Sequence, residues 1–167
     1  MKKFLLVLAV VFGLSTTAMA QQKGDAFIGG AIGFSAGTDS ATSFGLAVEG
    51  GGFVANRLAL SGEVAYNLVA GEINVVTAGP KLSYYARLAD KFYYTPGVSV
   101  VGAYVNVGGA DTGNIGVGLD LAAFEFRPTQ HFGMKVNLFS MSAMFNNGFS
   151  FSADMMMNTS VSFRYYF

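Results

Sequence analysis

The sequence predicts an all-β fold, an eight-stranded antiparallel up-and-down transmembrane β-barrel. Eight segments of strand length alternate apolar and polar residues, which is the period-two pattern of a β-strand. The connectors between them alternate along the chain between short and longer ones. Although 52% of the residues are hydrophobic, no apolar run after Gln21 approaches the ~20 residues of a spanning helix. Alternating segments can satisfy their backbone in lipid only by pairing in a closed sheet, so a barrel follows.

The first three segments, 25–35, 42–54 and 58–69, each have an apolar face and a face of small or polar residues. Each has about the length that a tilted membrane strand needs, roughly 10 residues. Glu49 and Glu63 fall on the second face, which we assign to the lumen. The predicted lipid-facing residues are Ala26, Ile28, Ile32 and Phe34, then Phe44, Leu46 and Val48, then Leu58, Leu60, Val64, Tyr66 and Leu68.

The fourth and fifth segments, 74–88 and 92–104, continue the alternation and place Lys81 on the lumenal face. Each contains a proline, Pro80 or Pro96, which removes a hydrogen-bond donor from the ladder. We interpret both prolines as bulges or strand irregularities. The predicted lipid-facing residues are Leu82, Tyr84 and Ala86, then Phe92, Tyr94, Val98, Val100 and Tyr104.

The sixth segment, 114–127, alternates cleanly in its first half and then changes phase. Phe124 and Phe126 have the opposite parity to the preceding lipid-facing residues, and a β-bulge at 122–123 would restore the alternation. The seventh segment, 131–141, is regular. The predicted lipid-facing residues are Ile115, Val117, Leu119 and Leu121, then Phe132, Met134, Val136 and Leu138.

The closing segment, 157–167, sets Arg164 on the lumenal face and Phe163, Tyr165 and Phe167 on the lipid face. A final aromatic residue on an apolar face is typical of the strand that closes an outer-membrane barrel, where it supplies one ring of the aromatic girdle. We expect this C-terminal barrel signature to engage the barrel-assembly machinery, and the outer surface of the barrel to contact outer-membrane lipid.

The connectors form two sets that alternate along the chain. Outer-membrane barrels have short periplasmic turns and longer external loops, so we expect both termini on the periplasmic side. The last long connector is rich in Met and Phe and has two interpretations: an adhesive or lipid-contacting patch, or an extension of the seventh and eighth strands with a hairpin turn at 146–148. The short connectors are 56–57, 89–90 and 127–130, and the longer ones are 36–41, 70–73, 105–113 and 142–153.

The N-terminus has the pattern of a secretory signal peptide. Lys2 and Lys3 precede an apolar run, and Ala18 and Ala20 form a small-x-small cleavage site. The apolar run is too short for a spanning anchor. We therefore expect residues 1–20 to be cleaved and residues 21–167 to form one barrel domain in the outer membrane of a Gram-negative bacterium.

The lumenal faces collect three acidic and three basic side chains. Unpaired charge in a lumen with little water is costly, so the balanced signs indicate ion pairs, and Arg164 is a candidate partner of Glu63 or Asp120. The interior of an eight-stranded barrel is just wide enough for side chains to fill it. These charges therefore either plug the lumen or line a narrow ion path. The predicted lumen charge network is Glu49, Glu63, Lys81, Asp120, Lys135 and Arg164.

The sequence offers little for catalysis or metal binding. His131 is the only histidine and the chain has no cysteine, so a catalytic base or a metal ion lacks the partners it needs. We expect no catalytic residue, metal or cofactor, and interpret His131 as a structural residue at the membrane interface. The balance of 10 basic and 10 acidic residues argues against nucleic acid as a partner.

The eight segments, the stretch from Gly118 to Pro128 and the final Ser160 to Phe167 resemble small outer-membrane barrel proteins of the OmpA/OmpX-like superfamily. They are most similar to the porin-family and outer-membrane β-barrel domains common in Bacteroidetes. The resemblance implies fold and location. It does not imply one activity, because that superfamily includes structural, adhesive, pore-forming and enzymatic members.

Four functions are compatible with these observations. The leading hypothesis is a non-enzymatic integral outer-membrane protein with a side-chain-filled lumen, whose external loops serve a structural role or contact an unknown surface ligand. The main alternative is a narrow channel for ions or small solutes. An outer-membrane lipid-modifying enzyme is a weaker candidate. Such barrels place a His beside a Ser at the outer rim, whereas His131, the only histidine of this chain, is expected at the opposite, periplasmic rim. A soluble lipocalin-like binder is the fourth.

Overall fold

The computed structural model describes residues 23–35, 42–69, 73–145 and 149–167, without the side chains of 34, 35, 149 and 152–160. The predicted signal peptide, the predicted connector 36–41 and the predicted hairpin turn at 146–148 lie outside the described residues. Among the residues described, there is no helix with the length and apolarity to cross a membrane.

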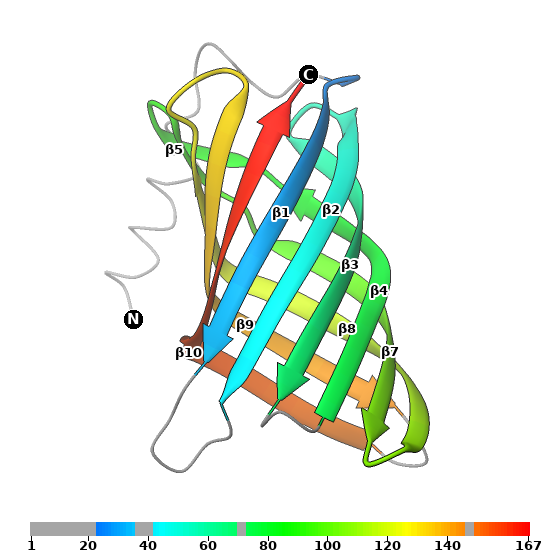
Figure 1. Cartoon of the computed structure of the whole chain (residues 1–167). Helices are drawn as coiled ribbons and strands as arrows, with labels where there is room; N and C mark the ends of the chain where they lie inside the picture. Colours follow the sequence, from blue (N-terminus) through cyan, green and yellow to red (C-terminus); the bar gives the residue numbers. More distant parts are fainter. Residues whose placement is uncertain (1–22, 36–41, 70–72, 146–148) are drawn as a thin grey trace, which may run out of the picture.

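Ten strand segments make up the described chain (Figure 1). They are β1 Ala26–Ser35, β2 Ser43–Ala55, β3 Leu58–Val69, β4 Ile73–Tyr84, β5 Ala86–Ala89, β6 Phe92–Tyr94, β7 Gly97–Val107, β8 Ala110–Phe126, β9 Phe132–Phe145 and β10 Phe149–Tyr166.

These segments close into one antiparallel ring of eight strands. β5 continues β4 after a break at Tyr85, and β6 and β7 form a single strand broken at Thr95 and Pro96. Going round the ring, the order is β1, β2, β3, β4, β7, β8, β9 and β10, and the pairing of β10 with β1 closes the circle. The predicted eight-stranded transmembrane β-barrel is confirmed.

Both prolines mark irregularities, as expected. The carbonyl of Pro96 accepts a hydrogen bond from the Tyr84 amide at 2.9 Å across the break that separates β6 from β7. Pro80 pairs in register with Gly62 of β3, but the ladder between β4 and β7 omits Gly79 and Pro80. The missing proline donor therefore interrupts the ladder only on the side of β7.

The predicted bulge in the sixth strand is confirmed. In the pairing of β8 with β9, the register is irregular between Asp120 and Ala123. Beyond this point Ala123 and Glu125 are buried, whereas Phe126 is 46% exposed. The bulge thus turns Glu125 into the barrel and keeps the phenylalanines on the lipid face.

Two of the predicted connectors are shorter than expected. The region 105–113 is part of a hairpin in which Val107 pairs with Ala110 across a turn of Gly108 and Gly109, both with positive φ, 57° and 88°. Polar residues there hide the strand in the sequence, because a hairpin outside lipid needs no apolar face. The glycines supply the left-handed conformations that close the turn.

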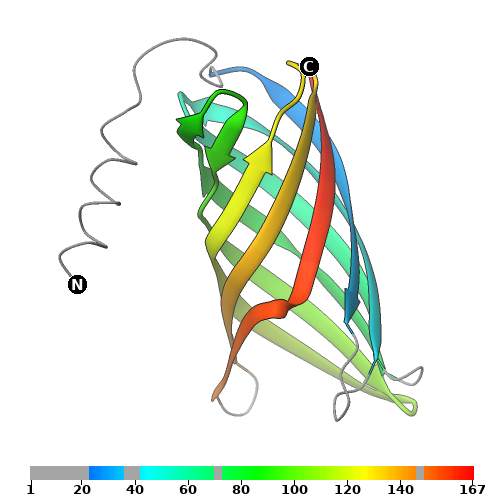
Figure 2. The same ribbon diagram turned by 90° about the vertical axis from the view of Figure 1, so that its left-hand side faces the viewer.

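The final hairpin is also longer than predicted. β10 begins at Phe149, not near residue 157, and Phe149 pairs with Phe145 of β9. The extended-hairpin interpretation of this region is therefore correct for the strands. The register shifts between Met155 and Ser160, and β10 changes direction in its N-terminal half (Figure 2). The parity of the sequence does not reveal this extension because the shift interrupts it.

The outer surface carries a continuous apolar face. Alternating residues such as Ile32, Val48 and Val64 are 56%, 62% and 57% exposed, while their chain neighbours turn inward. Such exposure matches a wall that is solvated by lipid. The start of β1 lies beside the end of β10, where Phe27 pairs with Tyr166. We call this the terminal end of the barrel, and the opposite one the loop end (Figure 1).

Candidate functional site

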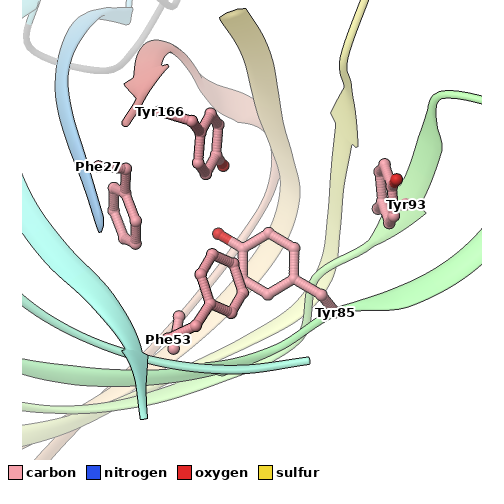
Figure 3. Packing of buried hydrophobic residues seen from close by; sticks show 6 residues of the cluster. Phe27, Phe53, Tyr85, Tyr93 and Tyr166 are labelled. Atoms are coloured by element: carbon pink, nitrogen blue, oxygen red, sulfur yellow. The ribbon is translucent and has the colours of Figure 1, made fainter. Parts of the chain in front are cut away.

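An aromatic cluster closes the lumen at the terminal end. Phe27, Phe53, Tyr85, Tyr93 and Tyr166 are each at most 5% exposed and come from β1, β2, the break after β4, β6 and β10. The Phe53 and Tyr85 rings meet edge to face at 5.0 Å between centroids, and those of Phe27 and Tyr166 lie 5.5 Å apart. Figure 3 shows these four rings converging, with Tyr93 to one side. We call the five rings the aromatic floor.

Arg127, from the connector between β8 and β9, adds a cation to this floor. Its guanidinium carbon lies 3.4 Å from the centroid of the Tyr166 ring and 5.9 Å from that of Tyr93. Its Nε is 3.6 Å from the Glu125 carboxylate. A guanidinium over an aromatic face is held by the ring quadrupole, which ties this connector to the barrel interior.

A buried ion cluster lies directly against the floor. Arg164 is 2% exposed, and its guanidinium donates to Glu49 through two nitrogens, one of them Nε at 3.1 Å. Nη1 donates to Glu125 at 3.0 Å and to the Tyr85 hydroxyl at 2.5 Å. Tyr166 donates to the other oxygen of Glu125 at 2.5 Å. Arg164 therefore joins β2, β8 and the Tyr85 break into one network.

A second ion cluster is centred on Asp120 of β8. Lys81 Nζ lies 2.5 Å from Asp120 Oδ2, and Asn137 donates to Oδ1 at 2.7 Å. Lys135 Nζ is farther from Oδ2, at 3.6 Å. Glu63 of β3 forms no ion pair or hydrogen bond within the described part of the chain, although it lines the same cavity.

A polar cavity of about 380 Å³ occupies the lumen on the loop-end side of these clusters, which we call the upper side. All six residues of the predicted charge network line it, together with small and polar residues that continue toward the loop end, including Asn67, Thr77, Ser140, Ser142 and Ser162. The lumen is thus filled by side chains in its terminal half and hollow above, which gives it the shape of a cup.

The structure corrects one predicted partner and adds others. Arg164 pairs with Glu49 and Glu125, not with Glu63 or Asp120. Glu125 is fully buried and is the residue that sequence reasoning missed, although the bulge at 122–123 already implied that the residue between Phe124 and Phe126 points inward. The pairing error has a different cause, because the relative heights of residues on different strands depend on the stagger of the whole barrel.

His131 lies at the rim of the terminal end. Its Nδ1 is 3.0 Å from the Tyr166 carbonyl oxygen, and its ring stacks on Tyr165 with 5.8 Å between centroids. Both contacts hold the end of β10 against the start of β9. In the part of the chain that the structure describes, no cluster of three or more His, Asp or Glu side chains could hold a metal ion.

The C-terminal signature residues lie on the lipid face. Phe163, Tyr165 and Phe167 are 43%, 50% and 70% exposed. Phe163 stacks on Phe132 of β9 at 6.1 Å, and Tyr165 meets Phe167 edge to face at 5.3 Å. Together with Phe132 they form an aromatic band on the lipid face of β9 and β10 at the terminal end.

Solved structures share this fold at low sequence identity. Neisserial surface protein A is 14% identical, and the match covers 84% of this chain and 95% of that one with a TM-score of 0.56. The N-terminal β-barrel domain of Pseudomonas aeruginosa OprF is 10% identical, with 88% and 100% covered and a TM-score of 0.57. No protein-family model matches the chain, and no curated protein does. These likenesses show the fold, that of small outer-membrane barrels.

Proposed function

We propose that this chain is an integral outer-membrane protein whose barrel is closed at the periplasmic end and open as a cup toward the outside, and which acts through its external surface. One observation carries the proposal. The aromatic floor and the Arg164 cluster fill the lumen at the terminal end, so the barrel presents a recess and two long hairpins, not a passage.

Three features support the location. The outer face is apolar around the ring, with aromatic residues at its terminal edge, as in barrels of the outer membrane. The fold is shared with small outer-membrane barrels. The sequence also begins with a predicted signal peptide. Membership of the OmpA/OmpX-like superfamily is part of this proposal, as is the Gram-negative origin.

A narrow channel is the alternative, and the cavity is the observation that favours it. Charged groups of both signs line a hollow in the upper lumen, and such groups also line ion paths. For conduction, however, the floor would have to move. Breaking the Arg164 cluster would leave buried carboxylates without a counter-charge, which is costly. The closed cup is therefore the proposal that the geometry supports best.

Single-channel recording in planar bilayers tests the closed cup. The refolded barrel should give no stable conductance steps at neutral pH, with the heat-modifiable band shift on gels as the check of folding and a general porin as the check of the bilayer. Stable steps that disappear in Glu63→Gln or Arg164→Ala would establish the channel and overturn the closed floor.

We propose that the protein has no enzymatic activity on membrane lipid. His131 is engaged by a backbone carbonyl and a tyrosine ring at the terminal rim, away from the external leaflet where such chemistry occurs. Overexpression should leave the mass spectrum of lipid A unchanged. A new acylation state of lipid A that disappears in His131→Ala would contradict this.

We also propose that β10 engages the barrel-assembly machinery through Phe163, Tyr165 and Phe167. Their lipid-facing aromatic band is available along the strand edge before the ring closes on β1. Phe167→Ala should lower the amount of folded protein in the outer membrane of cells while leaving refolding in detergent unchanged, and Phe132→Ala serves as an aromatic control on β9. Equal losses in both variants would show a general packing effect.

A further inference from the structure

The lumenal charges form one cluster beside the floor and a second cluster around Asp120, and Glu63 belongs to neither. Beside the floor, Arg164 and Arg127 face Glu49 and Glu125, and each of the four lies within 3.6 Å of an opposite charge in this set. This lower cluster is balanced and has little capacity for a ligand.

In the second cluster, Lys81 and Lys135 share one acid, Asp120. Asn137 donates a hydrogen bond to Oδ1 of Asp120 at 2.7 Å, and Lys81 forms an ion pair with Oδ2 at 2.5 Å. Lys135 is therefore a second cation on an acid that already has one, at the longer distance of 3.6 Å. Its side chain is 5% exposed, it lines the cavity, and it forms no hydrogen bond within the described part of the chain. An ammonium has three donors, so one that shares a single carboxylate with another cation can accept a further partner from the cavity.

Glu63 is the complementary group. It lines the same cavity, and its carboxylate has no direct partner among the residues described. β3 and β9, which carry Glu63 and Lys135, lie four strands apart in either direction round the ring of eight. Glu63 and Lys135, which have opposite charges, therefore stand on opposite walls of the cup.

We propose that the cup binds a small zwitterion, with the carboxylate of the ligand at Lys135 and its ammonium group at Glu63. The lining carries three acids and three bases, so it disfavours a ligand with net charge and accepts one with two opposite charges. Hydroxyl and amide groups of Ser140, Ser162 and Asn67 supply further hydrogen bonds along the wall. The cavity of about 380 Å³ lies within the usual range for small-molecule sites.

The ligand enters from the loop end, because the floor closes the other one. In this respect the inference rests on the proposed function. The two remain separable: conductance tests the floor, while equilibrium binding to the cup tests the ligand. A barrel that conducts and binds would overturn only the floor, and one that neither conducts nor binds would overturn only the ligand.

The test uses the refolded full barrel in lipid nanodiscs and amino acids of increasing charge separation: glycine, γ-aminobutyrate and ε-aminocaproate. Hexanoate and hexylammonium are matched probes that carry one charge each. Titration calorimetry, with amide shift changes by NMR to locate the site, should show one of the amino acids binding about tenfold or more tightly than either single-charge probe. Equal binding of hexanoate would reduce the site to an anion site and overturn the proposal, as would no binding of any amino acid.

Variants assign the two ends of the ligand. Lys135→Met and Glu63→Gln should each weaken binding about tenfold or more, and Lys91→Met and Asp111→Asn, which remove exposed charges outside the lumen, should not. Loss of affinity in the control variants, or none in the lumenal ones, would overturn the assignment. If a lumenal variant does not fold, the relative affinities of the native barrel for the five probes still test the proposal.

Discussion

Arg164 illustrates how one side chain organises the interior. It is almost fully buried and connects two carboxylates and a tyrosine hydroxyl from three parts of the ring. Desolvating three ions is expensive, and the attraction between them offsets this cost only while all partners are present. The cluster therefore stabilises the fold only while it is complete, and loss of its cation would destabilise the barrel.

Arg164→Ala should destabilise the barrel by about 3–5 kcal/mol, because Glu49 and Glu125 would remain buried without a counter-charge. Urea unfolding in lipid vesicles measures this change in the free energy of unfolding. Arg87→Ala removes the exposed pair with Asp90, at 2.7 Å, and is the matched control with an expected loss of less than about 1 kcal/mol. A loss from Arg164→Ala as small as that of the control would show that the cluster is solvated.

Gly79 is a second position where a single residue decides the local packing. A Cβ atom there would lie 1.9 Å from the carbonyl oxygen of Val100, a backbone atom that cannot move aside alone. Gly62, which pairs with Pro80 in the same region, has open space around its missing side chain. The two glycines thus form a natural pair for comparison.

We expect Gly79→Ala to cost about 1–3 kcal/mol through overpacking, whereas Gly62→Ala should be nearly neutral or slightly stabilising. Unfolding of both variants under the same conditions measures the difference. If the two substitutions had equal effects, the close approach of β7 to Gly79 would not be a real constraint.

Among the elements, the β7–β8 hairpin shows what alternation does and does not encode. The apolar residues that face lipid predict the strands up to Tyr104 and from Asn114 onward, but the part between them carries Asn106 and Asp111 and is predicted as a loop. The strands continue there because backbone hydrogen bonds and the Gly108–Gly109 turn hold them. The period-two signal comes from lipid, so it fades where the strands leave the membrane.

The tip of this hairpin should respond to pH. Asp111 is fully exposed outside the membrane, and hydrogen bonds from the Tyr104 hydroxyl and the Asn106 amide lower the pKa of its carboxyl below the usual value. Because the folded hairpin favours the carboxylate, this stabilisation is present above the ordinary carboxyl pKa and is lost as pH falls through the lowered one.

An NMR titration of the Asp111 carboxyl carbon measures this effect. The midpoint should lie below that of an unstructured Asp and should move upward in Tyr104→Phe and in Asn106→Ala. A midpoint at the unstructured value in the native protein would show that these hydrogen bonds do not persist at the hairpin tip.

The bulge in β8 shows the opposite case, an element in which the sequence carries the whole signal. Phe124 and Phe126 must face lipid, and only an extra residue at 122–123 reconciles them with Leu119 and Leu121. The irregular register of β8 against β9 follows. Its consequence for the interior is the burial of Glu125, which supplies the second carboxylate of the Arg164 cluster.

For the molecule as a whole, the aromatic floor decides whether the barrel is a cup or a channel. Its rings come from the terminal edges of strands around the ring and from Tyr85, where the chain breaks its strand. The rings lie on the terminal side of the ion clusters, so the lumen is closed by two layers, one aromatic and one charged. If the ion clusters alone were disrupted, the rings would still close the lumen.

Removing two rings should therefore open a path. We expect Phe27→Ala with Phe53→Ala to produce conductance steps in planar bilayers, while Ile28→Ala with Val54→Ala, the adjacent lipid-facing residues, should stay silent. Both variants must show the heat-modifiable band shift. If the folded variant without Phe27 and Phe53 gave no conductance steps, the ion clusters alone would seal the lumen. Conductance steps in the control variant without Ile28 and Val54 would indicate damage to the barrel wall.

The sequence by itself determined the strand faces, the balanced lumenal charge, the proline irregularities and the bulge, because lipid outside and a narrow interior impose a residue type on every second position. Only the tertiary structure decided which charges meet. Glu49, Glu125 and Arg164 lie on strands far apart in the chain, and ring closure with its stagger sets their heights. The same closure placed five aromatic rings in one layer and left Lys135 and Glu63 facing a cavity that no local pattern contains.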